Sequence, residues 1–545
     1  MSLLEYKSVK RLRQTLVSYR IGPKPWTRIL AEYAGKWYSL ALLLVFVACA
    51  AGIVLYRIDS HAFLYFGDAT SRVVKSREFI DSQHTGIGNI GTVWLPLPQL
   101  LLVPFVSING LFYSGIAGAM VGIPCLVGTG LLLFGIIRRI TRSLPIAFLG
   151  ACLFALNPNV VYMALTPMSE LSLFFFVALG GYALLRWLET DAMKWLLLSA
   201  VAVMLATLCR YEAWILAPFV SLVSASKGIG FLTESKRLSL KRIAGIAAIS
   251  FAGIAFWLVW NAAEYGDSLT FLHWTSSIAP AVSNYSLEQR PLANLVTFGR
   301  AILTIFGPAL LLVAAGVFIR FRHKAVEWKQ VMLLMFFSLP PLFIFFALMA
   351  GRVHMDQWWW NWRFVLTSGM FLSLAAAMGL SELFSRVRSM PVRVAIIAAL
   401  LMMPFAQITI PSVGVATFKD AAKSLVDTTP FATALGERLN SIDDKSSIAL
   451  LTGYGQAQRI MISSGLPLKR FHIICNPDSG GFLEPLWDSD RYVVVGIDRT
   501  LESQELIKHW LSQWSSKLKN YRIYHEDGNY MLLERREIFA LGETK

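Results

Sequence analysis

The residue best suited to chemistry is Asp68, because it lies in a polar, charged stretch of an otherwise apolar chain. This stretch, Arg57–Trp94, follows the first apolar run and precedes a long series of others. A carboxylate here could act as the general base that takes a proton from an attacking hydroxyl group. Arg72 lies four residues later, on the same face if the segment is helical, and is predicted to bind substrate. The alternative is an ordinary solvated ion pair, and Asp59 and Asp81 are rival carboxylates in the same stretch.

Three further ionisable residues interrupt or border apolar runs, where charge is costly and often functional. Glu170 follows Thr-Pro-Met-Ser at the start of an apolar run, so it is either a site residue or a helix cap. Arg210 and Glu212 break a second run. They could neutralise each other, or Arg210 could face a phosphate group. All three are candidate substrate-binding residues.

The segment Gly351–Arg363 combines His354, Asp356, two arginines and a cluster of tryptophans. The guanidinium group of arginine matches the geometry of phosphate and pyrophosphate, so Arg363 is a candidate substrate-binding residue. His354 and Asp356, in the same segment, are also candidate substrate-binding residues. The tryptophans could face a sugar or an isoprenoid chain, although an interfacial aromatic belt is the favoured interpretation. In the other long loop, His273, Asn261 and Asp267 are weaker candidates.

Composition identifies the class of protein that must position these residues. The chain has 545 residues, of which 55% are hydrophobic, and its mean hydropathy is +0.55. Repeated apolar runs of about 20 residues indicate a polytopic membrane protein. The net charge of +16 does not indicate nucleic-acid binding, because the part after residue 411 has a net charge of −1 and the excess lies in loops of the membrane part. Five widely spaced cysteines predict neither a disulfide framework nor a metal site.

Charge in the loops predicts the topology. The basic segment 1–36 is expected in the cytoplasm, and the run from Trp37 to Tyr56 is too long for a cleavable signal and is expected to be an anchor. The first outer loop, 57–111, should hold an amphipathic interfacial helix at Ala62–Ile80 and a re-entrant piece at Trp94–Val106. About eleven spans are predicted in all, namely 37–56, 112–137, 144–163, 171–188, 195–208, 215–224, 243–260, 298–319, 331–350, 364–380 and 394–410.

Residues 412–545 differ in kind and predict a small extracytoplasmic α/β domain. Four segments have strand patterns: SSIALLTGY, FHIICN, RYVVVGID and NYRIYHEDGNYMLLERR, the last with a hairpin turn at Glu526–Asn529. Helices are expected at Gln456–Ser464 and Leu501–Lys517. An odd number of spans places this domain outside.

The chain resembles the GT-C class of integral membrane glycosyltransferases, especially the branch with protein O-mannosyltransferases and the aminoarabinose transferase of lipid A. Four features carry the resemblance across residues 37–411: GDATSRVVKSREF at Gly67–Phe79, WLPLPQ at Trp94–Gln99, LVWNAAEYGDSLTF at Leu258–Phe271, and the alternating topology with an outer C-terminal domain. Ser268 stands where this class usually has proline.

The resemblance implies an enzyme that takes a sugar from a polyprenyl phosphate or pyrophosphate on the outer face, inverting the anomeric carbon. An acidic residue of the first outer loop would be the base, and carried over to this chain that residue is Asp68. The Asp-Glu pair frequent in the class is Asp68-Ala69, so the second acid is missing and Asp59 stays a rival. Some members use a metal, but only Asp68 and Glu170 suggest ligands, so metal independence and the absence of any cofactor are predicted.

The functional prediction is therefore a glycosyltransferase of the plasma (inner) membrane. Its partners would be a polyprenyl-phosphate-linked sugar donor, a glycan, lipid or protein acceptor, and membrane lipids, but no nucleic acid. The alternatives are a lipid-linked glycan transporter or flippase, which would show internal repeats and charges at mid-membrane, and a glycan polymerase or ligase that shares the donor.

Overall fold

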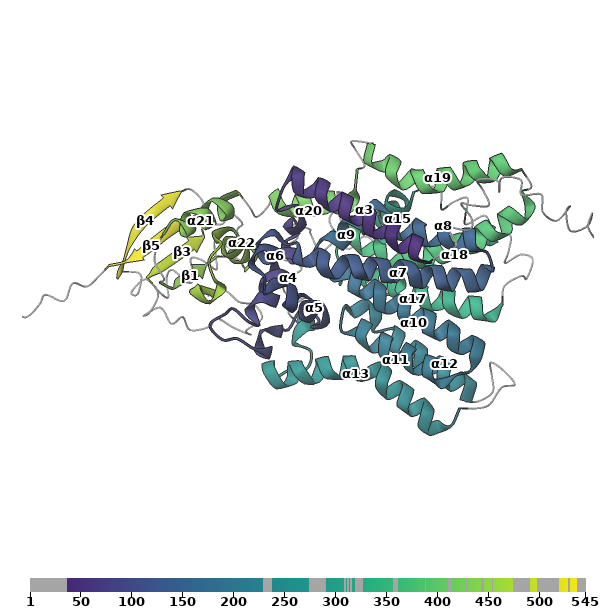
Figure 1. Cartoon of the computed structure of the whole chain (residues 1–545). Coiled ribbons are helices and arrows are strands. Elements are labelled where there is room, and N and C mark those ends of the chain that lie inside the picture. Colours follow the sequence, from purple (N-terminus) through teal and green to yellow (C-terminus); the bar gives the residue numbers. More distant parts are fainter. Residues whose placement is uncertain are drawn as a thin grey trace, which may run out of the picture.

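A computed structural model of the chain shows a bundle of helices with a small sheet domain at one end (Figure 1). It describes residues 37–228, 238–273, 291–307, 310, 313, 316–318, 327–355, 361–387, 389–409, 414–426, 430–442, 446–452, 454–473, 491–496, 519–527 and 530–536.

Six helical segments of the described chain are long and apolar enough to cross a membrane. They are α3 (Trp37–Ile58), α7 (Ala117–Thr141), α10 (Glu170–Thr190), α13 (Leu240–Tyr265), α17 (Trp328–Met349), and η4 (Trp362–Thr367) taken together with α18 (Ser368–Arg386). A seventh is counted if α8 (Leu144–Ala155) and α9 (Pro158–Leu165), which meet at a bend of 59°, form one span. The chain is a multi-pass membrane protein.

Shorter helices occupy the other predicted spans. They are α11 (Met193–Thr207), α12 (Leu216–Gly228), α15 (Pro291–Phe306) and α19 (Met390–Thr409). In α11, α15 and α19 the apolar stretch within the described residues is only 10–17 residues long, and α12 has 13 residues in all. The total of eleven spans therefore stays a prediction.

Three predicted spans have different boundaries in the described residues. The span expected over 298–319 begins earlier and is interrupted, because α15 ends at Phe306 and Gly307 follows at φ 74°. The span expected over 112–137 does not begin at 112, because α6 (Asn109–Ser114) ends at Gly115, whose φ of 74° suits glycine. The span expected over 144–163 is divided, because Pro158 cannot donate to the α8 hydrogen-bond ladder. Asn157 instead caps α9, accepting a hydrogen bond from the backbone N–H of Asn159 at 3.0 Å.

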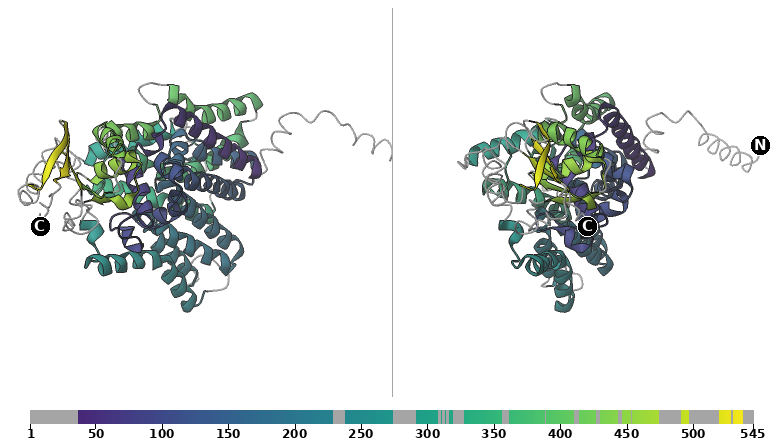
Figure 2. Two further views of the ribbon diagram at one scale, coloured as in Figure 1. Left: turned by 60° about the vertical axis from the view of Figure 1, so that its left-hand side comes forward. Right: turned by 90° about the vertical axis from the view of Figure 1, so that its left-hand side faces the viewer.

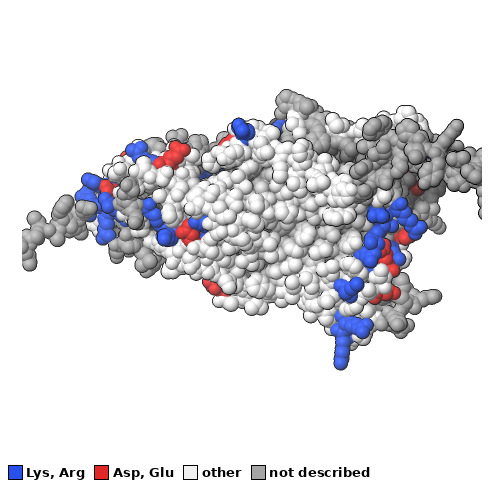
Figure 3. Space-filling view, in the orientation of Figure 1, with Lys and Arg blue, Asp and Glu red and all other residues white. Residues whose placement is uncertain are grey.

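The surface separates into an uncharged middle and two charged ends, as Figure 3 shows. Lys and Arg are present at both ends, and one group of them lies at the end away from the sheet domain. Arg138 and Arg139 lie in the last turn of α7, and Lys241 and Arg242 lie in the first turn of α13. The uncharged band matches the hydrocarbon region that spanning helices must cross.

The first loop folds at the other end, as η1 (Ala62–Leu64), α4 (Gly67–Glu78), η2 (Ile87–Ile90) and α5 (Leu97–Val106). The helix predicted at Ala62–Ile80 is present as α4, with η1 at the start of that range, and its place at the membrane interface stays a prediction. Arg72, Lys75 and Glu78 are all buried, because α4 packs between α5 and the sheet domain.

The C-terminal part is the predicted α/β fold. Its sheet has the order β2-β1-β3-β5-β4, with β1 parallel to β2 and β3, and β5 antiparallel to β3 and β4. The strands are β1 (Ile448–Leu451), β2 (Phe471–Ile473), β3 (Tyr492–Gly496), β4 (Tyr521–Asp527) and β5 (Tyr530–Arg535). β4 and β5 pair up to Asp527–Tyr530, as the predicted hairpin requires. The helix expected at 501–517 lies outside the described residues.

Three helices accompany this sheet: α20 (Ala416–Val426), α21 (Pro430–Asn440) and α22 (Tyr454–Ser464), the last matching the helix predicted at Gln456–Ser464. The domain caps the end of the bundle (Figure 2). Its core is continuous with the first loop, since Leu435 and Ile460 belong to the same buried cluster as Val73, Val74 and Leu102.

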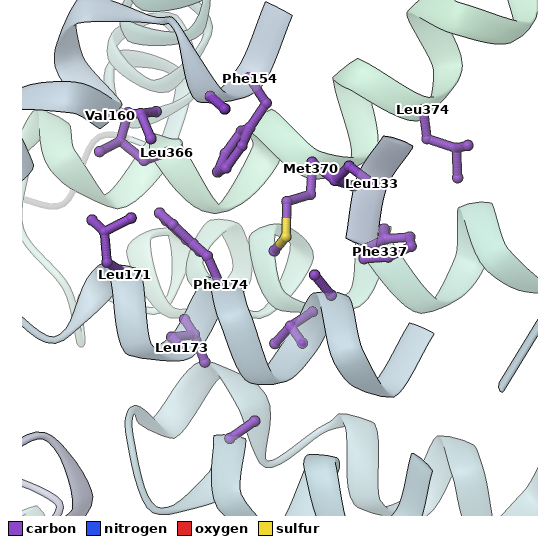
Figure 4. Packing of buried hydrophobic residues seen from close by; sticks show 14 of the residues in the cluster. Leu133, Phe154, Val160, Leu171, Leu173, Phe174, Phe337, Leu366, Met370 and Leu374 are labelled. Atoms are coloured by element: carbon purple, nitrogen blue, oxygen red, sulfur yellow. The ribbon is translucent and has the colours of Figure 1, made fainter. Parts of the chain in front are cut away.

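The larger core lies inside the helical body (Figure 4). Phe154 of α8 and Phe174 of α10 meet edge to face, with ring centroids 5.5 Å apart, and Leu366 of η4 belongs to the same buried cluster. The helical elements packed here include α10 and η4, which carry the predicted site residues Glu170 and Arg363.

Candidate active site

Five predicted residues from distant parts of the chain form one ion cluster. The Arg363 Nη2 atom lies 2.5 Å from Oδ2 of Asp68, and its Nε atom lies 3.7 Å from Oε1 of Glu170. Arg210 Nη1 lies 2.9 Å from the same Glu170 oxygen, and Arg210 Nε donates to Oε1 of Glu212. We call Asp68, Glu170, Arg210, Glu212 and Arg363 the ion cluster.

Each member stands at a helix terminus or a break. Asp68 and Glu170 lie in the first turns of α4 and α10, and Arg210 is extended in the break between α11 and η3 (Tyr211–Ala213). Arg363 lies in η4, which follows Asn361 in the left-handed region at φ 58°. Because these residues lie at helix termini and at the break before η3, their charged side chains meet at one level of the bundle. The central parts of the helices can therefore stay apolar.

Aromatic rings make cation–π contacts with Arg363 and Arg210. The Arg363 guanidinium lies 5.0 Å from the ring centroid of Phe66 and 5.4 Å from that of Phe364. Arg210 lies 5.4 Å from the same Phe364 ring. Such cation–π contacts stabilise a desolvated guanidinium, and they fix where the arginines can point.

Asp68 is the exposed member of the ion cluster. Its side chain is 39% exposed, whereas those of Arg363 and Glu170 are 9% and 1% exposed. The cluster is otherwise closed, so an incoming group reaches the carboxylate of Asp68 first. The interpretation of Asp68 and Arg72 as an exposed i,i+4 pair is wrong, because Asp68 pairs with Arg363 and Arg72 is buried.

Arg72 brings unused hydrogen-bond donors to the edge of the ion cluster. Its guanidinium lies 5.0 Å from the ring centroid of Trp94. Its Nε and Nη1 atoms are buried without a hydrogen-bond partner among the described residues. Burial lowers the pKa of Arg72 to about 10, so the group stays charged at neutral pH. Buried donors of this kind suit a negatively charged ligand.

Electrostatics keeps the Asp68 carboxyl ionised. Burial in the site raises its pKa, but attraction to Arg363, Arg72 and Arg210 outweighs that effect and lowers the pKa below its ordinary value. At neutral pH the group is a carboxylate that can accept a proton but cannot donate one.

The other predictions for the site have mixed outcomes. Glu170 binds arginines instead of acting in a capping motif, since Ser169 makes no side-chain cap bond and its hydroxyl oxygen accepts from Arg210 at 3.2 Å. Arg210 and Glu212 form an ion pair, which is one of the two alternatives left open by the sequence, and a phosphate contact of Arg210 stays a prediction. The carbonyl of His354 accepts a hydrogen bond from the Asn361 side chain at 3.0 Å, and no described contact brings the His354 ring to the ion cluster.

Asp356 and Trp358–Trp360 lie outside the described residues. Trp362 is fully buried, so for this tryptophan the belt interpretation is wrong. In the other long loop, Asp267 and His273 form an exposed pair at 3.0 Å.

The rival carboxylates are engaged elsewhere. Asp59 accepts a hydrogen bond from the Tyr65 hydroxyl at 2.5 Å, and Asp81 pairs with Arg77 at 3.0 Å. Neither contacts the ion cluster among the described interactions. The described residues also hold no group of three or more His, Cys, Asp or Glu side chains that could bind a metal, and metal independence stays a prediction.

Segments quoted for the resemblance meet around the site. Trp94, which begins WLPLPQ, faces Arg72, and the N–H of Leu97 donates to the carbonyl of Leu208 just before the break at Arg210. In the third segment, Asn261 accepts a hydrogen bond from the Thr92 hydroxyl. The order of motifs along the sequence thus corresponds to adjacency in space.

Asp420 was missed by the sequence analysis. This carboxylate of α20 is buried, and its Oδ1 atom accepts a hydrogen bond from the N–H of Asn361 at 3.2 Å. Burial raises the pKa of Asp420 to about 7 despite the opposing attraction of Arg363. Nothing local to its sequence distinguishes it from a solvated charge on an amphipathic helix.

Comparison of the whole chain with solved structures identifies the fold. The crystal structure of ArnT from Cupriavidus metallidurans bound to undecaprenyl phosphate superposes with a TM-score of 0.54 at 12% identity, over 91% of this chain and 98% of that one. Its apo structure gives 0.51 over 90% and 97%. The chain has the GT-C fold. The resemblance seen in the sequence is therefore confirmed at the level of fold.

A more distant likeness is to the oligosaccharyltransferase of Archaeoglobus fulgidus, which has 12% identity, a TM-score of 0.46 and coverage of 91% of this chain and 73% of that one. No protein-family model and no curated protein sequence matches the chain. At these identities the likeness is one of fold.

Proposed function

We propose that this protein transfers a sugar from a polyprenyl-phosphate-linked donor to a hydroxyl acceptor, with Asp68 as the general base. The observation that carries the proposal is the exposed carboxylate of Asp68 at the edge of an otherwise closed cluster of arginines. The fold, shared with an ArnT structure that holds undecaprenyl phosphate, supports a lipid-linked donor.

The chemistry follows from the charges. The acceptor hydroxyl attacks the anomeric carbon from the face opposite the leaving phosphate, so the configuration inverts. Asp68 accepts the hydroxyl proton, and the electron pair of the broken C–O bond passes to the phosphate oxygen. A carboxylate of low pKa can do this because the hydroxyl becomes acidic only as its bond to carbon forms.

Arg72 suits the leaving phosphate. Its unpaired N–H groups can bind phosphate oxygens, and this interaction strengthens as negative charge develops there. Arg363 is less free for this role, because it already binds Asp68 and Glu170. We therefore assign Arg72 to the donor phosphate, and Arg363 and Arg210 to the support of Asp68 and the surroundings of the phosphate.

The orientation in the membrane is part of the proposal. Helix α4, which carries Asp68 in its first turn, lies beside the sheet domain at one end of the molecule (Figure 1), and α7 runs from there to the other end, where its last turn carries Arg138 and Arg139. Basic loops face the cytoplasm, so the site and the domain would face outward in the plasma membrane. The acceptor would be a glycan, lipid or protein available on that face.

The test is Asp68→Asn in protein reconstituted into nanodiscs with a panel of undecaprenyl-phosphate-linked sugars, measuring acceptor-dependent release of undecaprenyl phosphate. Loss of a general base predicts a decrease in kcat of about 10²- to 10⁴-fold. Asp81→Asn, which alters a carboxylate of the same loop outside the ion cluster, should keep its turnover. Near-normal turnover of Asp68→Asn would refute the proposal that Asp68 is the general base.

The same preparation separates the alternatives. Flux of lipid-linked glycan across sealed vesicles without sugar transfer would indicate a transporter or flippase. Long products with repeated units would indicate a polymerase, and transfer of one preassembled glycan would indicate a ligase.

A further inference from the structure

Helix α20 contacts both segments that carry the Asp68–Arg363 pair. Thr417, Asp420 and Ser424 follow one another at intervals of three and four residues, so their side chains share one face of this helix. Each of the three binds a different element. α20 begins only a few residues after the membrane part of the chain and precedes the sheet, so it connects the two parts at the level of the site.

The first contact anchors α20 to the helical body. The N–H of Thr417 donates to Oδ1 of Asn159 at 2.9 Å, and its hydroxyl donates to the Asn159 carbonyl at 3.3 Å. Asn159 belongs to α9 and is itself buried. The start of α20 is therefore fixed relative to a rigid element of the bundle.

The other two contacts reach the site. The Ser424 hydroxyl accepts a hydrogen bond from the N–H of Gly67, the residue before Asp68, at 3.1 Å. One turn earlier, Asp420 accepts from the N–H of Asn361, two residues before Arg363. One helical face thus holds the backbone on both sides of the ion pair.

The turn at Asn361 is held by two hydrogen bonds. Asn361 has φ 58°, in the left-handed region, which asparagine adopts more readily than most non-glycine residues. Its side chain donates to the His354 carbonyl, and its N–H donates to Asp420. This turn sets the direction in which η4 begins, and so the direction in which Arg363 points.

A buried carboxylate such as that of Asp420 is unusual at a contact that serves only packing. Its second oxygen, Oδ2, is buried without a hydrogen-bond partner among the described residues. The groups that face it are Arg363 on η4, Asp68 on α4 and Tyr162 on α9. A neutral side chain could accept the same N–H at lower cost, so the negative charge, which attracts Arg363, calls for a functional explanation.

We propose that Asp420 is a positioning residue for sugar transfer: it holds the 361–363 backbone and the charge of Arg363 in the place where Arg363 orients Asp68. Ser424 does the same for the backbone at the start of α4. The effect on catalysis rests on the proposed function. The positioning of the backbone by Asp420 and Ser424 does not depend on that function.

The activity test compares Asp420→Asn and Asp420→Glu with the parent protein, using Asp81→Asn as the carboxylate control. A misplaced base lowers kcat, on the order of 100-fold for a displacement near 1 Å, whereas the affinity for undecaprenyl phosphate alone should stay within about twofold because Arg72 is untouched. Asp420→Glu should recover part of kcat. The parent should lose kcat as pH falls through neutrality, and Asp420→Asn should lack that step.

A second measurement does not need activity. Hydrogen exchange should become faster in peptides covering 361–367 for Asp420→Ala, which removes the acceptor of the Asn361 N–H, and in those covering 67–71 for Ser424→Ala. If Asp68→Asn is inactive while Asp420→Asn keeps the parent kcat and pH profile, this inference is overturned and the proposed function stands. If no variant, the parent included, transfers sugar, unchanged exchange at 361–367 overturns the inference and faster exchange there supports it.

Discussion

Replacing Asp420 with Asn should stabilise the protein at alkaline pH. Burial raises the pKa of this carboxyl from 3.8 to about 7, with Arg363 offsetting only part of the effect. The folded state then binds the proton more tightly than the unfolded state does. The contribution of Asp420 to stability is fully present below about pH 4 and is lost as pH rises through about 7.

The magnitude follows from that shift. A change in pKa from 3.8 to about 7 corresponds to roughly 4 kcal/mol at pH values above both. Since part of this cost is already present at pH 5, the difference between pH 5 and pH 8 should be about 2–3 kcal/mol. Asn does not titrate, so the stability of Asp420→Asn relative to the parent should increase by about that amount between the two pH values.

The assay is thermal unfolding in nanodiscs, followed by tryptophan fluorescence at pH 5 and pH 8. The control is Asp81→Asn, which alters a carboxyl that pairs with Arg77 at 3.0 Å. If Asp420→Asn is destabilised more at pH 8 than at pH 5, the attraction of Arg363 outweighs burial and the reasoning fails. A stabilised variant with reduced kcat would show that the charge is kept at the expense of stability.

Three further changes test other parts of the structure. Arg72→Ala should weaken the binding of undecaprenyl phosphate about 10- to 100-fold, because hydrogen bonds between charged groups are lost. Arg72→Lys should recover little of this affinity. If a titration gives the parent and Arg72→Ala the same affinity, the assigned phosphate contact is excluded. Gly122→Ala places a methyl group 2.2 Å from the Ala164 carbonyl oxygen and should lower stability by about 1–3 kcal/mol in thermal unfolding, whereas Gly110→Ala, with open space around it, should not. Glu534→Gln should destabilise the sheet by about 1–3 kcal/mol at pH 7, because hydrogen bonds from Arg522 lower the pKa of Glu534. That difference should shrink as pH falls below about 4, and a pH-independent difference would contradict it.

The ion cluster was largely predictable because charge in an apolar context is conspicuous. Glu170, Arg210 and Arg363 interrupt or border apolar runs, and such positions are costly unless the charges are paired. The strands of the C-terminal sheet were predictable for a similar reason, since short apolar runs such as Ile448–Leu451 and Tyr492–Gly496 stand between polar segments. Both signals are local, and neither depends on the tertiary structure.

Pairing was not predictable, because it is set by tertiary contacts. Sequence spacing favoured Asp68 with Arg72, yet Asp68 binds Arg363, 295 residues away. The burial of α4 was missed for the same reason. Its charges look solvated in sequence, but α5 and α22 cover them, and the period of α4 itself gives no sign of those partners.

The contacts of the C-terminal part suggest why this part of the chain stays close to the site. Asp68, the proposed base, and its partner Arg363 lie on segments 295 residues apart in the sequence. Segments that are separate in sequence have no covalent means of keeping a 2.5 Å contact such as that of Arg363 with Asp68. α20 supplies the connection through Asp420 and Ser424, and α22 adds a bond from Arg459 to the Tyr65 carbonyl at 3.0 Å. If this reasoning holds, a loosened α20 should impair the chemical step more than donor binding, and Ser424→Ala should lower kcat without weakening the binding of undecaprenyl phosphate.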